Sequence, residues 1–435
     1  MRSAFRQKRL EVAALVSMGA IYFFSYFQRS AVPGTVFNEL QADLRLSASE
    51  VASLGAVFLG VYAWMQLFVG VAADRFGGRR TLLFGGVLMT AGAAVFPLCH
   101  SKEMLYASRA VTGFGASFMY LSIVKEIDTL FGPRHFAAIL GCMLFIGYSG
   151  GIAATLPFER AVAAWGWRHA LLGAAALTAM LLVAGWAVLR RVPHTHRAAP
   201  LSLRPLGDIA RNRANLPLFG WSLINFPVYF VMQAVFGKKF LQDFAGLSSA
   251  GAASVLLLMV SVCAGATFSG GFLLRWTAHR RKPVLIGTSI LILAAALLLL
   301  TGVLWRAPAW ALLLPLLLLA LAPAAGPASA ALAKELNPPE TAAQSVATMN
   351  FTAYIGVATL THLCGIAMDL HEDSARVTSA GTVYPPEAYA WMFALLAVAA
   401  LACLVASFYI TETHGRSIRE APGPRERAEL TGTGA

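Results

Sequence analysis

The sequence predicts an all-α polytopic membrane protein, with twelve transmembrane helices arranged as two six-helix halves. Hydrophobic residues make up 58% of the 435 positions and charged residues only 13%, whereas a soluble domain is about half apolar and a quarter charged. The apolar residues gather in long runs, and a run of about 20 residues is enough for a helix to cross a bilayer. A basic, proline-containing stretch at 190–216 separates six of these runs from the other six.

The predicted spans follow one another with short polar connections. The first extends to about Leu40 if its helix kinks at Pro33, where proline removes a backbone donor. No cleavable leader is expected, because the basic start runs into an apolar span too long for one. The spans cover residues 11–31, 49–72, 81–99, 104–125, 135–157, 167–189, 217–237, 249–274, 283–305, 309–331, 342–368 and 388–410.

These spans divide the chain into four parts. Residues 1–189 form an N-terminal six-helix half, 190–216 a cytoplasmic linker and 217–412 a C-terminal six-helix half. Residues 413–435 are polar, with Gly and Pro, and we expect a disordered cytoplasmic tail there.

The formal charge of +13 is distributed as in a membrane protein, which argues against nucleic acid as a partner. Most of the 34 Lys and Arg fall in the termini and in the loops on the same side of the spans, so both termini are predicted to be cytoplasmic. Basic loops at that face are suited to contact anionic lipid headgroups. The five cysteines lie in or at the ends of spans, without a C-x-x-C pair, so neither a disulfide framework nor a metal or other cofactor is expected.

A charged turn between the second and third spans has the pattern G-x-x-x-D-R-x-G-x-R-R. Positive residues in a cytoplasmic loop are expected in any case, but they do not require glycines or an aspartate at fixed spacing. The turn resembles the loop between helices 2 and 3 of the major facilitator superfamily of secondary transporters. That resemblance implies a gating role for its fixed residues, which are Gly70, Asp74, Arg75, Gly77, Arg79 and Arg80.

A weaker copy of this loop follows the eighth span, with Gly271, then Arg275 where the first copy has its aspartate, then basic residues at 280–282. Two halves that repeat a loop at matching places agree with the internal repeats of the superfamily.

The fourth span contains an arginine within apolar sequence. Arg109, Gly113 and Gly115 follow the R-x-x-x-G-x-G pattern and resemble a further motif of the superfamily. An arginine inside a bilayer costs several kcal/mol unless it is paired or faces water, which favours a functional role. The alternative is that Arg109 binds backbone carbonyls of the first span, and the glycines serve close helix packing. Lys125 ends the same span on nearly the opposite face, because the helical period is about 3.6 residues.

Polar stripes mark four spans. In the first, Tyr22, Tyr26 and Arg29 share one helix face, and residues 26–29 resemble the first-helix motif of organic-anion and sugar-phosphate members of the superfamily. In those members the arginine contacts an anionic group of the substrate, although Gln28 here replaces a frequent aspartate. Helix–helix hydrogen bonding would explain each of the other stripes alone, but together they predict a central hydrated cavity for solute. Those stripes are Tyr62 and Gln66, then Asn225, Tyr229 and Gln233, then Asn350 and Tyr354.

Two absences bear on the kind of transport. None of the 21 Asp and Glu lies in the middle of a predicted span. Proton coupling, often carried by a buried carboxylate, would therefore need a carboxylate near a span end, or His362. The fifth span also lacks the Gly-Pro pair usual in exporters of the superfamily.

The sequence therefore predicts a secondary transporter rather than an enzyme. It would move a small anionic or zwitterionic solute (an organic acid, amino acid, nucleoside or sugar phosphate) by alternating access, with proton-coupled uptake left open. Residues 113–136 and 233–237 resemble a bacterial branch of sugar-phosphate permease-like proteins that includes phagosomal nutrient transporters. This resemblance implies a monomer in the bacterial inner membrane. The alternatives are an exporter of drugs, siderophores or metabolites and, from another class, a non-transporting membrane sensor.

Overall fold

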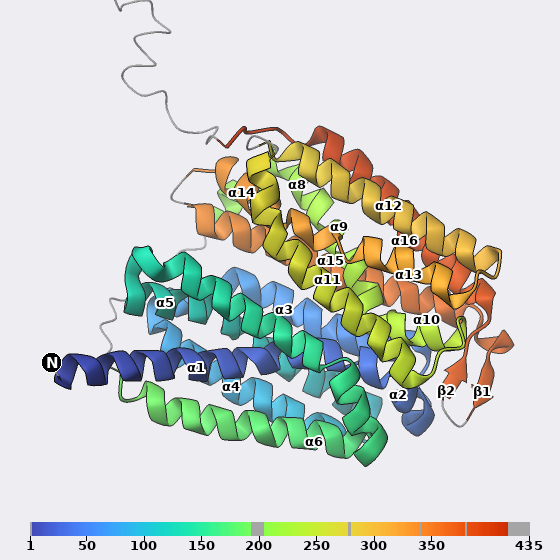
Figure 1. Ribbon diagram of the computed structural model, residues 1–435, viewed down its shortest axis with the longest axis horizontal. Helices are drawn as coiled ribbons and strands as arrows, with labels where there is room; N and C mark the ends of the chain where they lie inside the picture. Colours follow the sequence, from blue (N-terminus) through green and yellow to red (C-terminus); the bar gives the residue numbers. More distant parts are fainter. Residues whose placement is uncertain (1, 193–203, 277–279, 339–340, 379–380, 416–435) are drawn as a thin grey trace, which may run out of the picture.

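The protein is a bundle of long helices, most of which run along one axis of the molecule (Figure 1). The computed structural model describes residues 2–192, 204–276, 280–338, 341–378 and 381–415. Within these ranges, the side chains at 2–6, 74, 128, 132–138, 204–205, 268, 270–276 and 342–343 lie outside the description.

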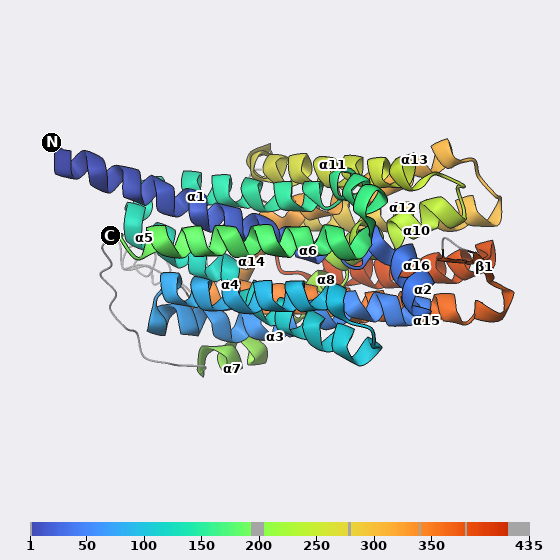
Figure 2. The same ribbon diagram turned by 90° about the horizontal axis from the view of Figure 1, so that it is seen from below.

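The two ends of the bundle differ. One end carries a short antiparallel hairpin of β1 (Arg376–Thr378) and β2 (Gly381–Val383), and is called the hairpin end below. The opposite end, where α1 (Arg2–Ala31) begins, is called the terminal end (Figure 2). The long helices among the described residues run between these two ends.

The N-terminal half contains the first six predicted spans. The first continues beyond α1 through a short 3₁₀ turn into α2, as the predicted kink at Pro33 requires. Its elements after α1 are η1 (Gly34–Val36), α2 (Phe37–Leu44), α3 (Ala48–Phe76), α4 (Gly78–Val95), η2 (Phe96–Leu98), α5 (Lys102–Ala153) and α6 (Leu156–Leu189).

Helix α5 contains two predicted spans and turns back on itself (Figure 1). Tyr120 on its first arm stacks on Tyr22, with ring centroids 6.4 Å apart. Gly147 on its second arm lies against the rings of the same Tyr22 and of Tyr26. Both arms therefore pass the middle of α1, and α5 supplies two crossings.

The C-terminal half follows α7 (Arg204–Arg211), a short helix inside the predicted linker. The rest of that linker, 193–203, and the predicted tail from 416 on lie outside the described residues. The elements of this half are α8 (Asn215–Ser222), α9 (Asn225–Val231), the π-helical η3 (Met232–Phe236), α10 (Gly237–Asp243), α11 (Ser249–Trp276), α12 (Lys282–Leu304), α13 (Ala309–Leu319), η4 (Ala322–Ala325), α14 (Gly326–Glu335), α15 (Ala342–Asp369), η6 (Glu372–Ser374) and α16 (Pro386–Tyr409).

The prediction of an all-α polytopic membrane protein is confirmed. Among the described residues, 10 helical segments are long and apolar enough to cross a membrane, and Ile139–Ala153 is a shorter apolar helix. The first arm of α5 is less apolar, because it carries Ser108, Arg109 and Thr112. Large apolar side chains such as Phe145 (69% exposed) face outward, as a lipid-facing surface requires. The β-hairpin was not predicted, since three-residue strands are too short for a period-two pattern.

Two crossings of the C-terminal half are interrupted near their middle. The seventh breaks between α8 and α9 and then widens into the π-turn η3, with Pro227 just after the break. The tenth breaks at η4, where Pro323 and Pro327 interrupt the backbone ladder. Interrupted helices at membrane depth occur where the backbone is buried in protein or lines a cavity.

Corresponding helices of the two halves make corresponding contacts at the terminal end. Arg79, at the start of α4, donates from Nη1 to the carbonyls of Leu189 (2.8 Å) and Val192 (3.1 Å) at the end of α6. Lys282, at the start of α12, donates from Nζ to the Phe408 carbonyl (2.7 Å) at the end of α16. In each half the third crossing is thus bonded to the end of the sixth, as expected if the two halves are structural repeats.

The chain just after α16 is also held at this end. Glu412 accepts the backbone N–H groups of Arg281 (2.9 Å) and Lys282 (2.8 Å) at the N-terminus of α12. Burial raises the pKa of Glu412, but these bonds and those from Thr413 and His414 outweigh it and hold the pKa below its usual range. The first residues of the tail predicted at 413–435 are therefore anchored, since Thr413 also donates its hydroxyl to Glu335.

Candidate functional site

A cavity of about 380 Å³ lies between the two halves of the bundle. α1 and α5 line it from the N-terminal half. From the C-terminal half it is lined by the two interrupted crossings (α8, α9 and η3, then η4 and α14) and by α11 and α15. It extends from Arg29 towards the terminal end, where Ala330 and Val346 lie on its wall. Seven residues of the predicted polar stripes line it, namely Tyr26, Arg29, Asn225, Tyr229, Gln233, Asn350 and Tyr354.

Arg29 is the charged group of this cavity and is only 4% exposed. Its guanidinium carbon lies over the rings of Tyr26 (4.6 Å), Tyr62 (4.7 Å) and Tyr354 (5.1 Å). Nη1 donates to the Tyr354 hydroxyl at 2.8 Å, while Nε is buried without a hydrogen-bond partner. A guanidinium held by ring faces and one hydroxyl keeps most of its charge available to an anion.

The three other residues of the predicted polar stripes, Tyr22, Tyr62 and Gln66, do not line the cavity. Tyr22 packs edge-on against Tyr26, with centroids 5.2 Å apart, and Tyr62 contacts Tyr354 in the same manner at 4.8 Å. Both rings therefore support cavity residues from behind. Gln66 is 2% exposed and lies between α3 and α5, where its amide donates to the Ser117 carbonyl at 3.4 Å. The structure does not bring it to the cavity.

Three amide side chains face the cavity from the C-terminal half. Gln233 sits on the π-turn η3, and its Nε2 is buried without a hydrogen-bond partner. Asn225 begins α9 after the break and donates weakly to Thr288, at 3.4 Å. Asn350 lies one turn before Tyr354 on α15. A π-turn changes the direction of the side chains it carries and is often found at functional positions.

Arg109 lies away from the cavity and binds the backbone of two helices. It is 1% exposed, and its guanidinium donates to the carbonyls of Leu54 (3.3 Å), Gln28 (3.2 Å) and Val32 (2.8 Å). Its carbon also lies 4.4 Å above the Phe58 ring. The geometry is that of the structural alternative raised by the sequence, in which this arginine ties the fourth crossing to the first.

The glycines beside Arg109 allow this contact. A Cβ on Gly113 would come within 2.4 Å of the Phe58 carbonyl oxygen, and one on Gly115 within 2.2 Å of the Met89 backbone nitrogen. Both positions are therefore closed to larger residues by neighbouring backbone. Lys125 is half-buried towards the turn of α5, on a part of the helix that does not line the cavity.

We expect Arg109→Met to reduce thermal stability in detergent, because several buried carbonyls lose a donor at about 1–3 kcal/mol each. Arg109→Lys keeps the charge but reaches fewer carbonyls, so its thermal stability should lie between those of the parent and of Arg109→Met. Thermal unfolding measures this, and solute affinity is expected to persist in the folded fraction. A variant as stable as the parent that has lost solute binding would instead assign Arg109 a direct role.

The charged turn between α3 and α4 is built on Gly77. Its φ of 88° lies in the left-handed region, which favours glycine, and it links the two helices directly. The backbone N–H of Arg79 donates to Glu126 at 2.7 Å. Arg75 and Arg80 are exposed, and a Cβ on Gly70 would meet only Leu121, at 3.7 Å. The side chain of Asp74, central to the predicted gate, lies outside the described residues.

An ion cluster at the hairpin end was not predicted. Lys238 of α10 is 2% exposed and binds Glu159 of α6 and the Thr35 carbonyl. Glu39 of α2 lies 3.8 Å from the same ammonium. The cluster joins the two halves across their interface. The sequence signal was weak, because two lysines at the end of an apolar span suggest only side chains reaching the membrane surface.

A second set of bonds joins the halves beside this cluster. Asp369 of α15 accepts hydrogen bonds at the start of α3, from the Ser47 hydroxyl (2.8 Å) and the Ala48 (2.9 Å) and Ser49 (3.1 Å) N–H groups. Asn38 donates to Gln242 at 3.1 Å. A carboxylate at a helix N-terminus is favoured by the helix dipole. These contacts gather at the hairpin end, which is therefore closed.

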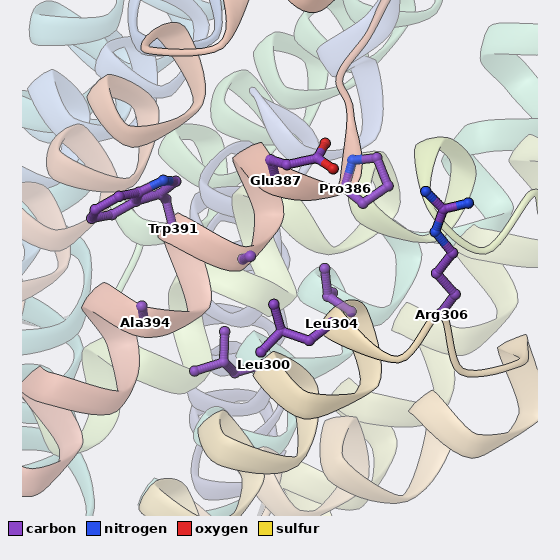
Figure 3. A pocket seen from close by; sticks show the side chains of 9 residues that line it. Leu300, Leu304, Arg306, Pro386, Glu387, Trp391 and Ala394 are labelled. Carbon is purple, nitrogen blue, oxygen red and sulfur yellow. The ribbon is translucent and has the colours of Figure 1, made fainter.

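A second hollow, of about 470 Å³, lies at the outer surface near the hairpin end, between α12 and α16 (Figure 3). Leu300, Leu304 and Trp391 line it, with Arg306 and Glu387 close by. Leu304 and Trp391 are each 61% exposed. This hollow belongs to the surface, where aromatic and basic residues commonly meet lipid headgroups. The central cavity, with its convergent polar groups, is the better candidate site.

Two six-helix halves around a central cavity are the architecture of a class of membrane transporters built from structural repeats. The family model of the Major Facilitator Superfamily matches residues 18–361. The chain belongs to this superfamily.

Solved structures share the fold at low sequence identity. One is a bacterial homolog of the human lysosomal transporter Spinster in an inward-facing, unoccupied conformation (TM-score 0.73, 18% identity, 92% of this chain and 98% of that chain). Another is a variant of the nucleoside transporter NupG (TM-score 0.72, 14% identity, 91% and 99%). At these identities the similarity concerns the fold alone.

Curated relatives match shorter stretches. A facilitated glucose transporter of solute carrier family 2, member 10, from Mus musculus is 30% identical over 175 residues, 40% of this chain and 32% of its own length. Monocarboxylate transporter 7 of Homo sapiens is 25% identical over 164 residues (37% and 30%). The hexuronate transporter of Bacillus subtilis (strain 168) is 26% identical over 137 residues (32% and 32%). Each match spans about a third of the relative.

Proposed function

We propose that this protein is a secondary transporter that binds a small anionic solute at Arg29 and carries it across the membrane by alternating access. The observation that carries the proposal is the cationic group of the central cavity, which is 4% exposed and held by three rings and one hydroxyl. A buried cation held in this way is costly unless an anion completes it. The cavity lies between the halves, where alternating access needs its site.

The proposed orientation in the membrane rests on the distribution of charge. Arg75, Arg79, Arg80, Arg190 and Lys282 gather at the terminal end, and the excess of basic residues indicates the cytoplasmic face. The hairpin end then faces outward and is closed by the contacts of Lys238 and Asp369. In this arrangement the solute site is reached from the cytoplasm. Opening to the outside requires the halves to part at the hairpin end.

The names of the relatives agree with a solute of this kind without specifying it. They include carriers of sugars, monocarboxylates and hexuronate. Of these solutes, monocarboxylates and hexuronates carry a carboxylate, for which Arg29 would be the partner. The cavity residues thus favour the acids among these solute classes.

A thermal-shift screen of the purified protein against organic acids, amino acids, nucleosides and sugar phosphates tests the proposal, because a ligand that binds the folded state stabilises it. Hits are then tested for uptake into proteoliposomes, with and without a pH gradient. Stabilisation and uptake confined to uncharged solutes would contradict the proposal. Uptake that ignores the pH gradient would exclude proton coupling.

The turn at 70–80 is proposed as a latch at the cytoplasmic face, in which Asp74 pairs in one conformation and parts in the other. We expect Asp74→Asn to fold normally and to slow uptake, since it removes the charge but keeps the size. The matched control is Asp208→Asn on α7, outside the turn. Uptake rates at saturating solute measure the effect, and parental turnover in Asp74→Asn would remove the latch.

A further inference from the structure

We infer that the central cavity is specific for a monocarboxylate, a solute with one carboxylate, no second charge and an aromatic or apolar body. The inference rests on the proposed function and narrows it, because a small anionic solute includes dicarboxylates and phosphate monoesters as well as monocarboxylates. Three properties of the wall support it, namely its charge, the free edge of Arg29 and the character of the opposite side.

The first property is charge. Among the described residues that line the cavity, Arg29 is the ionised group, and Asp, Glu, Lys and His are absent. One cation balances one anionic charge. A dicarboxylate or a phosphate monoester, with about 1.5 to 2 charges, would leave excess charge without a partner in a poorly hydrated site. The ammonium of an amino acid would find no carboxylate there and would be repelled by the guanidinium.

The second property is the geometry of the guanidinium. Nη1 is bound to the Tyr354 hydroxyl at 2.8 Å, and Nε is buried without a hydrogen-bond partner. The side of the group that carries Nε therefore has an unfilled donor, which a carboxylate reaches when the rings around it move. A planar carboxylate with two oxygens matches an arginine edge better than any other common monoanion.

The third property is the wall supplied by the C-terminal half. Trp221, Phe226, Tyr229 and Phe230 present aromatic surface to the cavity. Asn225, Gln233 and Asn350 add amides between these rings, and Nε2 of Gln233 has no hydrogen-bond partner among the described residues. Such a wall suits an aromatic or branched apolar body that carries a few uncharged hydrogen-bonding groups.

A series of ligands that share one phenyl skeleton and differ in charge tests the inference. The probes are hydrocinnamate (one negative charge), phenylalanine (zwitterion), phenylsuccinate (two negative charges), hydrocinnamide (neutral) and phenethylamine (positive). Affinities come from thermal shifts over a concentration series on the full-length protein. We expect hydrocinnamate to bind at least about tenfold more tightly than each other member, since a charge-assisted hydrogen bond contributes about 1.5–3 kcal/mol.

Each other outcome has a distinct meaning. If phenylalanine or phenylsuccinate binds more tightly and Arg29→Gln abolishes that binding, the monocarboxylate inference fails but the anion site stands. If hydrocinnamide binds as well as hydrocinnamate and Arg29→Gln has no effect, the proposed function fails as well. If none of the probes stabilises the protein, the inference is overturned, and the broader solute screen decides the proposed function.

A variant that adds a carboxylate to the wall provides an independent test. Gln233→Glu places a negative charge on the C-terminal wall, and we expect the affinity ratio of phenylalanine to hydrocinnamate to rise by at least about tenfold. Gln233→Met, of similar size and without charge, is the matched control and should leave the ratio near that of the parent. An unchanged ratio in a folded Gln233→Glu protein would mean that wall charge does not set specificity.

Discussion

Replacing Arg29 with glutamine is expected to abolish solute binding and uptake while leaving the protein at least as stable as the parent. The loss follows from removing the cation of the cavity, at about 1.5–3 kcal/mol for a charge-assisted hydrogen bond, or roughly 10- to 100-fold in affinity. The stability follows from the environment, because a guanidinium that is 4% exposed and lacks a carboxylate is costly to bury. Binding sites often trade stability for function in this way.

Thermal unfolding measures the stability of the variant, and its shift with a solute identified by the screen measures binding. Proteoliposome uptake then measures transport. Gln66→Met is the matched control, since Gln66 carries an amide on a predicted stripe but binds Ser117 rather than lining the cavity. It should transport like the parent. Uptake by Arg29→Gln with unchanged affinity would show that the anion binds elsewhere. Loss of uptake in Gln66→Met would place solute contacts outside the cavity described.

Replacing Lys238 with methionine is expected to open the hairpin end and stop net uptake. Lys238 and Glu159 are 2% and 4% exposed, and they belong to opposite halves. Removing one partner of a buried pair costs about 3–5 kcal/mol, because the other charge stays buried and unpaired. Separation of the halves lets water reach Glu159, so the cost falls on the closed state alone. That is enough to shift a two-state equilibrium by roughly 100-fold or more.

Spin labels on Cys introduced at Ala42 and Ser248, exposed positions of opposite halves at the hairpin end, report the opening as a longer distance. The background is Cys142→Ser, since Cys142 is exposed and the other four cysteines are buried. Lys239→Met is the matched control. Lys239 is 1% exposed, but it pairs with Asp243 of its own half at 2.8 Å.

The control should lose thermal stability without a change in the label distance. The double variant Lys238→Met with Glu159→Gln should restore the short distance, because no unpaired charge then remains on α6. An equal lengthening in both single variants, or none in Lys238→Met, would show that this cluster does not hold the hairpin end closed.

The sequence predicted those features of the fold for which a local pattern allows one physical interpretation. Long apolar runs can only be membrane spans or buried helices, so the class of fold followed from them. Gly77 is needed for a backbone with φ of 88°, and the pattern G-x-x-x-D-R-x-G-x-R-R at 70–80 indicated that turn. The stripe of Tyr26 and Arg29 indicated a polar face, and both side chains line the cavity.

Several features depend on partners distant in sequence, and no local pattern contains them. Arg109 and Arg29 look alike in the sequence, as arginines in apolar spans. Arg109 meets three backbone carbonyls, and Arg29 meets three rings and a hydroxyl. Gln66 and Gln233 are likewise both amides on predicted stripes. Gln233, on the π-turn η3, lines the cavity, whereas Gln66 donates to the Ser117 carbonyl away from it.

The sequence by itself thus determined a polytopic helical membrane protein, its repeated loop and the helix faces that carry polar groups, since these depend on composition and helical period. The tertiary structure decided which polar groups meet. It placed Lys238 against Glu159 across the interface of the halves and, within the described residues, gave Arg29 three rings and a hydroxyl in place of a carboxylate. The physical reason is that the cost of a buried charge depends on its partners, and those partners come from other helices.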